Sequence, residues 1–310
     1  MKRPFITLAL LTLCVTLHAA ERVPGTKVSI DAPAGFESTT QYPGFAMEST
    51  GASIIVTEAP APYLELLKGM TPEAMAPRGM ELLEKSEVKI APGKAHLLRI
   101  RQAANGVTFL KWMLVFGHEK ESVFVLAAVP EEFDKELGET MKKALLTTTW
   151  EPEAEIDFYE GLTFRVKESG DLKIATKVGN MIMMTRGGLK VQTDPRAPML
   201  LVGPSISEDW TVPGDKADYA RERLVKTEIL ANAKLTSEKT VKFDGLSGYL
   251  MEAEATDRKS GIPLYAMQCM LFTDDGYYVL QAFVDAEEKP KYSKVFLTIL
   301  KSFKCSNSAE

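Results

Sequence analysis

The sequence predicts an α+β fold of two tandem α/β/α sandwich modules, each with a central, mainly antiparallel sheet covered by helices. Three observations lead to this prediction. A block of two apolar runs followed by a helical pattern occurs twice, beginning at Gly106 and at Gly261. Nearly every residue of these runs is apolar, as expected of strands that are buried on both faces. Short polar turns join the runs, and such turns produce antiparallel hairpins.

The two copies of the block agree in the order of their features. The paired segments are the first apolar runs (106–116 and 261–272), the polar turns (117–122 and 273–276) and the second apolar runs (123–129 and 277–284). An aromatic residue closes each copy, Trp150 in the first and Phe303 in the second. Because order and spacing are both kept, we interpret the chain as a duplication of one module.

A helix is predicted at the end of each block. Apolar residues recur at helical spacing after Pro130 and again after Pro290, and proline is favoured in the first turn of a helix. The two stripes are Phe133, Leu137, Met141 and Leu145 in the first copy, and Tyr292, Val295, Phe296, Ile299 and Leu300 in the second.

A second helix is predicted upstream of each block. In the first module Thr71 and Pro72 form an N-cap pattern, and the helix is expected to continue over Met80, Leu82 and Leu83. Its counterpart is expected from Asp215 onward, with Ala217, Ala220 and Leu224 on one face. Earlier strands are expected at 27–30, 53–57, 96–102, 162–166, 180–185 and 249–254.

Residues 1–20 are predicted to be a signal peptide. Lys2 and Arg3 precede an apolar run that is too short to cross a bilayer, and Ala19 and Ala20 precede a polar stretch. The expected domains are then 21–150 and 151–305, followed by a polar tail at 306–310. We therefore expect export, to the periplasm or out of the cell, and no transmembrane segment in the mature chain.

The charge pattern excludes one class of partner. The net charge is −5 and the two signs are interspersed, so the basic stripe that follows a nucleic-acid backbone is missing.

Two cysteines, Cys269 and Cys305, lie after the predicted signal peptide. An oxidising compartment would allow them to form a disulfide, and the sequence leaves open whether they pair or remain free thiols.

The layout resembles the PsbP-like superfamily, which includes the photosystem PsbP proteins and bacterial periplasmic proteins of the DcrB kind. The opening strand Lys27–Phe36 and the order of Pro-rich loop, helix, hairpin and C-terminal helix are similar to that family. The second half departs from it at 162–167, which lacks the Pro-x-Gly-Phe step. The resemblance implies an α/β/α sandwich used for binding, assembly or scaffolding, with no shared catalytic residues.

Catalytic signatures are missing from the sequence. It has no P-loop, Rossmann fingerprint, His-Glu-x-x-His or Cys-x-x-Cys pattern, so no cofactor is expected and the function is interpreted as non-enzymatic. A hydrolase using His96 or His118 is one alternative. His118 falls in a predicted turn, and His96 is expected to be a partly buried, hydrogen-bonded strand residue beside Leu98 and Ile100.

Soft-metal binding is a second alternative. Thioether and thiolate groups favour cuprous ion, and the candidate ligands are Met181, Met183, Met267, Cys269 and Met270. Methionine also fills irregular cores, so we expect these side chains to be packed rather than to converge.

The function expected is binding of an envelope protein or a small ligand. If helices cover both faces of each sheet, the irregular loops and the crevice between modules are what remain available. We therefore expect the site at 194–214, with Trp210 as its anchor, and at the junction near 151–155.

Overall fold

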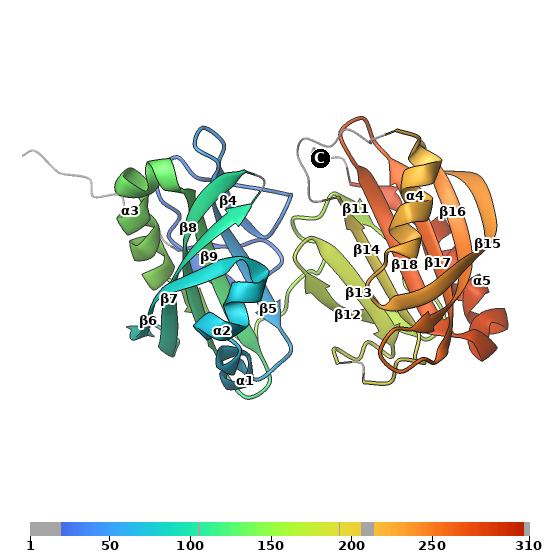
Figure 1. The fold of residues 1–310 in the computed structure, drawn as a ribbon, viewed down its shortest axis with the longest axis horizontal. Helices are drawn as coiled ribbons and strands as arrows, with labels where there is room; N and C mark the ends of the chain where they lie inside the picture. The colour runs from blue at the N-terminus through green and yellow to red at the C-terminus, as the bar shows by residue number, and fades with distance from the viewer. Residues whose placement is uncertain (1–19, 105, 192, 206–213, 307–310) are drawn as a thin grey trace, which may run out of the picture.

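A computed structural model describes residues 20–104, 106–191, 193–205 and 214–306 of the chain. Two modules lie side by side, each built on a seven-stranded antiparallel sheet, which confirms the predicted fold class (Figure 1). The strands of the first sheet, in spatial order, are β3 (Glu37–Ser38), β4 (Gly44–Met47), β5 (Ala52–Ala59), β9 (Ser122–Pro130), β8 (Val107–Gly117), β7 (Gly93–Ala104) and β6 (Met80–Ile90).

The second sheet repeats this arrangement. Its strands, in spatial order, are β12 (Leu172–Val178), β13 (Met181–Arg186), β14 (Met199–Pro204), β18 (Tyr277–Asp285), β17 (Pro263–Phe272), β16 (Leu246–Asp257) and β15 (Leu230–Phe243). The predicted equivalent strands, β8 and β17, occupy the same position in their sheets, each between the two strands that flank it along the chain.

Two small sheets join chain segments that are distant in sequence. In the first module β2 (Val28–Ile30) pairs with β1 (Glu21–Arg22) and β10 (Thr149–Trp150). In the second module β11 (Phe164–Arg165) pairs with β19 (Lys304–Cys305). The beginning and the end of each module are therefore held together by backbone hydrogen bonds.

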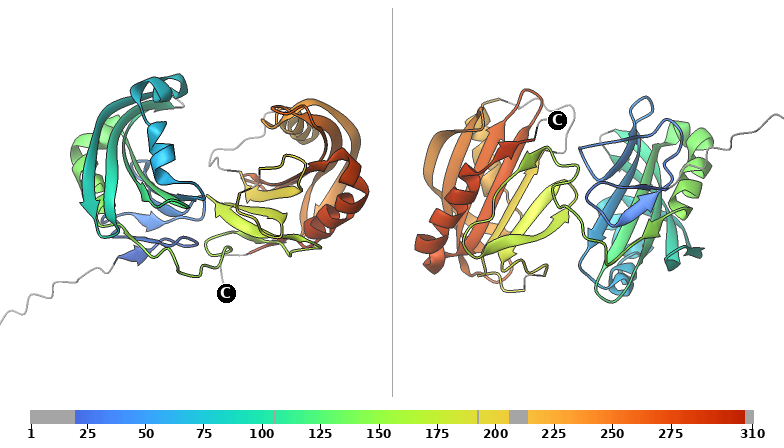
Figure 2. Two further views of the ribbon diagram at one scale, coloured as in Figure 1. Left: turned by 90° about the horizontal axis from the view of Figure 1, so that it is seen from below. Right: turned by 180° about the vertical axis from the view of Figure 1, so that it is seen from behind.

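Helices lie on both faces of each sheet (Figure 2). The helices of the first module are α1 (Tyr63–Lys68), α2 (Pro72–Met75), η1 (Ala76–Arg78), η2 (Glu131–Phe133) and α3 (Asp134–Leu146). Those of the second are α4 (Lys216–Val225), η3 (Ala286–Glu288) and α5 (Lys289–Lys301). The helices predicted after Pro130, after Pro290 and from Asp215 are thereby confirmed, and no described helix is long and apolar enough to cross a membrane.

The helix predicted from Thr71 is much shorter than expected. The Thr71 hydroxyl accepts a hydrogen bond from the backbone of Ala74, as the N-cap pattern predicts, but α2 and η1 end at Arg78. Gly79 follows with a φ of 68°, a left-handed conformation that ends a helix. Met80 therefore opens β6, and its alternating exposure is that of a strand rather than of the predicted helix.

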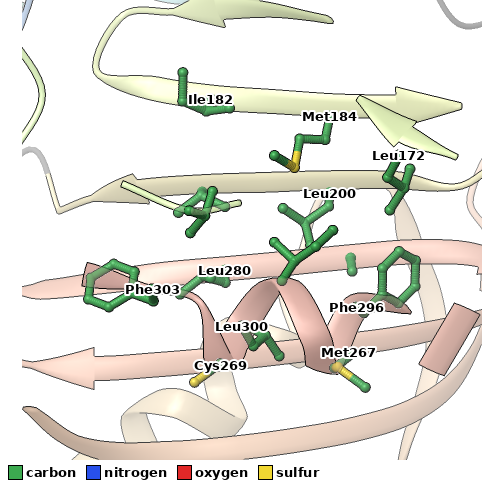
Figure 3. Packing of buried hydrophobic residues seen from close by; sticks show 14 of the residues in the cluster. Leu172, Ile182, Met184, Leu200, Met267, Cys269, Leu280, Phe296, Leu300 and Phe303 are labelled. Atoms are coloured by element: carbon green, nitrogen blue, oxygen red, sulfur yellow. The ribbon is translucent and has the colours of Figure 1, made fainter. Parts of the chain in front are cut away.

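Successive residues of each strand point to opposite faces of the sheet, and the apolar ones form a separate core on each face. In the second module α5 buries Phe296 and Leu300 against Cys269 and Met267 of β17 (Figure 3). The alternate residues of β17, such as Met270, face the opposite side and pack beneath Ala220 and Leu224 of α4. The first module is layered in the same way, with α3 on one face and α1 and α2 on the other.

The outer strand of each sheet is long and charged. β6 and β15 lie at opposite ends of the molecule and are mostly exposed (Figure 1). Their charged residues are Glu81, Glu84, Lys85, Glu87 and Lys89 in β6, and Lys234, Glu238, Lys239 and Lys242 in β15. The opposite edge of the second sheet, β12, faces the first module.

Candidate functional site

The two modules meet around Lys177 of β12, which is only 9% exposed. Its Nζ donates hydrogen bonds to the backbone carbonyls of Glu160, at 2.7 Å, and Pro24, at 3.4 Å. Beside it, Asn180 Nδ2 donates to the carbonyl of Gln41 at 2.5 Å. Pro24 and Gln41 belong to the first module, so these hydrogen bonds join the two modules at the centre of their junction.

Glu160 makes a second connection between the modules. Its carboxylate accepts hydrogen bonds from Arg22 Nη2 at 2.6 Å and from the backbone N–H of Gly25 at 3.0 Å. The segment that follows β10 is thereby fixed to the beginning of the chain.

A hollow of about 390 Å³, the linker hollow, lies on one side of the hydrogen bonds around Lys177. Both modules and the connecting segment line it, with Gly25, Lys27, Glu58, Glu121, Ala154, Glu155, Ile156, Phe158, Thr176, Lys177 and Lys190. Ala154 and Glu155 belong to the segment 151–155, where the sequence predicts the junction surface. The structure thus places part of the predicted junction surface at a cavity.

Ion pairs connect charged side chains that line the linker hollow. The Glu121 carboxylate accepts hydrogen bonds from Lys27 of the same module, at 3.0 Å and 3.2 Å, and from Lys190 of the other module, at 3.1 Å. Burial alone would raise the pKa of Glu121, but these lysines lower it below the usual range. Glu58 differs, because burial raises its pKa despite hydrogen bonds from Lys27 N–H and Trp150 Nε1.

A second hollow of about 380 Å³, the hairpin hollow, lies where the β17–β18 turn approaches the first module. Its lining is mainly polar and comprises Thr40, Gln41, Glu48, Thr163, Pro204, Ser205, Thr273, Asp275, Gly276, Tyr277 and Tyr278. The Tyr278 hydroxyl donates to Thr163 Oγ1 at 2.9 Å, and Tyr277 N–H donates to Ser205 Oγ at 3.2 Å. These bonds fix the position of the turn.

The largest of the three hollows lies within the second module and was not expected. This helix pocket, of about 610 Å³, lies between α4 and the sheet. Its lining is Met181, Met199, Leu201, Tyr219, Glu222, Arg223, Lys226, Thr227, Glu228, Ile229, Gln281 and Phe283. The expectation that helices fill both sheet faces is wrong at this place, because α4 packs mainly over β15 and β16 and leaves the face of β13 and β14 open beside it.

The predicted anchor Trp210 lies outside the described residues, as does most of the loop before α4. Arg196 of the predicted surface 194–214 pairs with Asp285, at 3.4 Å, and its carbonyl accepts from Asp285 N–H at 3.0 Å. The start of that surface is therefore attached to the end of β18.

The two histidines have different surroundings. His118 Nδ1 accepts hydrogen bonds from the backbone N–H groups of Lys120 and Glu121, at 3.1 Å and 3.2 Å, which shapes the β8–β9 turn. His96 lies on β7 as predicted, but its buried Nδ1 has no hydrogen-bond partner, contrary to the expected hydrogen-bonded histidine. Burial lowers the pKa of His96. Within the described ranges neither ring is hydrogen-bonded to a serine or cysteine side chain, as a hydrolase nucleophile would require.

The sulfur-bearing residues are divided between the two faces of the second sheet. Met267 and Cys269 face α5, whereas Met270 faces α4, and Met181 lines the helix pocket. The expected packing of Met267 and Met270 in the core is thereby confirmed, and the sheet itself separates them. The part of the chain that the structure describes also holds no cluster of three or more His, Cys, Asp or Glu residues suited to a metal.

Both described cysteines are free thiols. Cys269 is fully buried, and burial raises its pKa to about 12. Cys305 lies in β19 and is partly exposed. The pairing that the sequence left open is not present.

Two residues central to these hollows, Lys177 and Arg223, were not found by sequence reasoning. Each is a single basic residue in an ordinary strand or helix pattern, and nothing in the local sequence distinguishes it from its neighbours. Only the contact between modules, or between α4 and the sheet, gives these side chains a special position.

Comparison with known proteins gives similarity to solved structures alone. No protein-family model and no curated protein matches the chain. The apo structure of the type VI secretion immunity protein TplEi from Pseudomonas aeruginosa aligns over 92% of this chain and 96% of its own, with 10% identity and a TM-score of 0.35.

Two further structures align with about half of the chain. LpqN of Mycobacterium tuberculosis, described as involved in cell envelope biogenesis, covers 46% of this chain and 83% of its own, with 13% identity and a TM-score of 0.34. Cyanobacterial PsbP from Synechocystis covers 46% and 82%, with 10% identity and a TM-score of 0.30. These values assign no family to the chain.

Proposed function

We propose that the chain is an exported, non-enzymatic protein that binds a partner protein or a small ligand of the cell envelope. The observation that carries this proposal is the linker hollow, because both modules and the segment between them line it. Sites between domains are common places for binding, since two rigid surfaces supply their side chains together. The predicted signal peptide supports the compartment.

We further propose that the modules, 21–150 and 151–305, arose by duplication of one PsbP-like unit. The equal strand order of the two sheets supports this origin. A duplicated pair held rigidly by Lys177 and Glu160 creates a surface that neither copy has alone. The proposal that this unit is PsbP-like rests on the resemblance of its opening strand and of its order of elements to that superfamily.

Glu155 is the residue best suited to test the linker hollow. It lines the hollow, is exposed, and takes part in none of the described hydrogen bonds or ion pairs of the junction. Reversing its charge therefore changes the binding surface without removing a structural contact. Glu139 of α3 is a matched control, because it is also an exposed glutamate and its helix lies on the side of the first module away from the second (Figure 1).

The experiment is a pull-down from an envelope extract with the full chain, Glu155→Arg and Glu139→Arg. We expect Glu155→Arg to lose most of the captured partner, because a reversed charge at an interface repels a partner selected for the original charge. Glu139→Arg should capture as much as the unmodified chain. Equal capture by all three would contradict the assignment to the linker hollow, and Trp210→Ala then tests the loop proposed from the sequence.

A further inference from the structure

The helix pocket combines an apolar floor with a polar wall. The floor comes from alternating residues of β14, Met199 and Leu201, which point away from the core filled by Leu200 and Val202. Their cross-strand partners on β18 are Phe283 and Gln281. Helix α4 supplies the wall through residues that are three or four positions apart and so share one side of the helix: Tyr219, Glu222, Arg223 and Lys226.

Gly203 shapes the floor of this pocket. A Cβ atom at this position would lie 2.4 Å from Met181 Cγ, so only glycine leaves space for the Met181 side chain to lie across β14. Met181 extends the apolar surface from the neighbouring strand. The pocket is thus formed by the packing of the sheet and needs no movement of β13 or β14.

Arg223 lines this pocket and carries an unsatisfied donor. Its Nε is buried without a hydrogen-bond partner, and no carboxylate of the described residues lies within ion-pair distance of it. The guanidinium lies over the ring of Tyr277, 5.4 Å from the ring centre. A buried donor without an acceptor is unfavourable, and an oxygen atom of a bound molecule would relieve this cost.

The other polar groups of the wall already have partners. Lys226 forms an ion pair with Glu222 one turn earlier, and the amide of Gln281 donates to Thr227 Oγ1 at 3.0 Å and to Gln268 Oε1 at 2.7 Å. Arg223 is therefore the one cationic group of the lining that has no carboxylate partner among the described residues, and the carboxylate of Glu228 also lies at the lining. This charge favours an anion with one negative charge over one with two.

We infer that the helix pocket binds a small amphiphile with an apolar chain and a single carboxylate. The carboxylate accepts hydrogen bonds from Arg223, and the chain lies on the floor of Met181, Met199, Leu201 and Phe283. Arginine suits this role because its planar fork matches the two oxygens of a carboxylate. A volume of about 610 Å³ is in the range that holds small organic ligands.

The strands of the floor favour a small molecule over an extended peptide. β14 is hydrogen-bonded to β13 on one side and to β18 on the other, so its backbone offers no free edge to which a peptide strand could add. Binding at the pocket must therefore use side chains, as expected for a short acyl chain. This site is separate from the linker hollow, and its occupation does not depend on the proposed function.

The experiment compares decanoate with 1-decanol by isothermal titration calorimetry, using the full chain and ligand concentrations below micelle formation or the solubility limit. The two ligands share an apolar chain and differ in the charged head. We expect decanoate to bind at least about tenfold more tightly, since a hydrogen bond to a charged group contributes that much. Equal affinities, or no binding of decanoate, would overturn the inference.

Variants locate the site. Arg223→Met should weaken decanoate binding to the level of 1-decanol, whereas Arg221→Met, on the same helix but paired with Glu238 outside the pocket, should leave it unchanged. Leu201→Trp fills the floor and should weaken both ligands, which gives a readout if Arg223→Met folds poorly. Unchanged decanoate binding in both pocket variants would place the ligand elsewhere.

Two further ligands decide the chemical class. Decyl phosphate at pH 8 carries two charges and should bind less tightly than decanoate. An apolar pentapeptide with a free C-terminal carboxylate should also bind less tightly. Tighter binding of either one would overturn the assignment to a small monocarboxylate.

Discussion

Lys177 and Glu160 are joined by a hydrogen bond of 2.7 Å between the lysine Nζ and the glutamate backbone carbonyl. The same Nζ also reaches the carbonyl of Pro24 in the first module, so one ammonium group holds three segments of the chain together. Because this lysine is buried, its protonation depends on whether the junction between the modules is formed.

Lys177 should make the stability of the protein rise with pH above pH 8. Burial lowers the pKa of Lys177 to about 8, against an ordinary value of 10.5 in the unfolded chain. Between these values the unfolded chain holds a proton that the folded chain has lost, so raising the pH favours folding. We expect a gain of about 2 kcal/mol between pH 7.5 and pH 9.5, measured by urea unfolding.

A Lys177→Met variant is the control for that measurement. It lacks the titrating group but keeps the opposing contributions of buried thiols and tyrosines, whose pKa values are raised in the folded chain. The difference in unfolding free energy between the two proteins should grow with pH. A difference that stays constant would show that Lys177 keeps its ordinary pKa.

Glu121→Gln should loosen the contact between the modules. The variant loses the charge that pairs with Lys27 and Lys190, and we expect a loss of about 1 kcal/mol at pH 7. Because these lysines lower the pKa of Glu121, its contribution is present above the ordinary glutamate pKa and is lost as the pH falls through the lowered value. Unfolding at pH 7 and pH 3 measures this difference.

The control for that variant is Glu119→Gln, which removes an exposed glutamate from the same turn. Limited proteolysis adds a second readout, because a looser junction exposes the segment 151–163 to cleavage. If both variants were cleaved at the same rate as the unmodified chain, the Glu121 pairs would not hold the modules together.

The two cysteines should react with Ellman's reagent in different steps. In a chain that begins at Glu21, we expect the partly exposed Cys305 to react in the native protein. Cys269 should react only after unfolding, because it is fully buried and burial raises its pKa to about 12. Cys305→Ser should therefore abolish the native reaction, and a disulfide in the native chain would leave no reactive thiol at all.

Each module should fold when it is expressed alone. Residues 21–150 and 151–305 contain separate apolar cores, and each range includes all strands of its seven-stranded sheet. We expect cooperative thermal unfolding of both fragments, at lower temperatures than in the intact chain because the bonds of Lys177 and Glu160 across the junction are lost. A fragment without a cooperative transition would show that the modules depend on each other for folding.

The sequence predicted the central strands and the long helices because their patterns leave no alternative. Runs such as 263–272 are apolar apart from Gln268 and are buried at every position but the first, and only a covered strand of a sheet buries a short run of that kind. The pattern at the start of the outer strand β6 predicts part of a helix, because its spaced leucines and glutamates also suit a helical face. Gly79, with its positive φ, decided between the two possibilities.

The hollows could be predicted only in part. A crevice near 151–155 could be predicted, since a short polar connection between two modules indicates their contact. Its lysines and glutamates come from segments as distant as Lys27 and Lys190, and no local pattern brings these together. The helix pocket depends on which part of a sheet α4 leaves uncovered, which periodicity does not reveal.

The charged outer strands have a consequence for the behaviour of this protein at high concentration. A strand with one unpaired edge exposes backbone N–H and C=O groups to which a strand of another molecule can pair. Repeated pairing of this kind produces a continuous intermolecular sheet. In β6 and β15 the lysines and glutamates would have to be brought together and stripped of water for such an addition. We therefore expect the folded chain to stay free of edge-to-edge fibril growth, a protection useful to any protein kept in a crowded compartment.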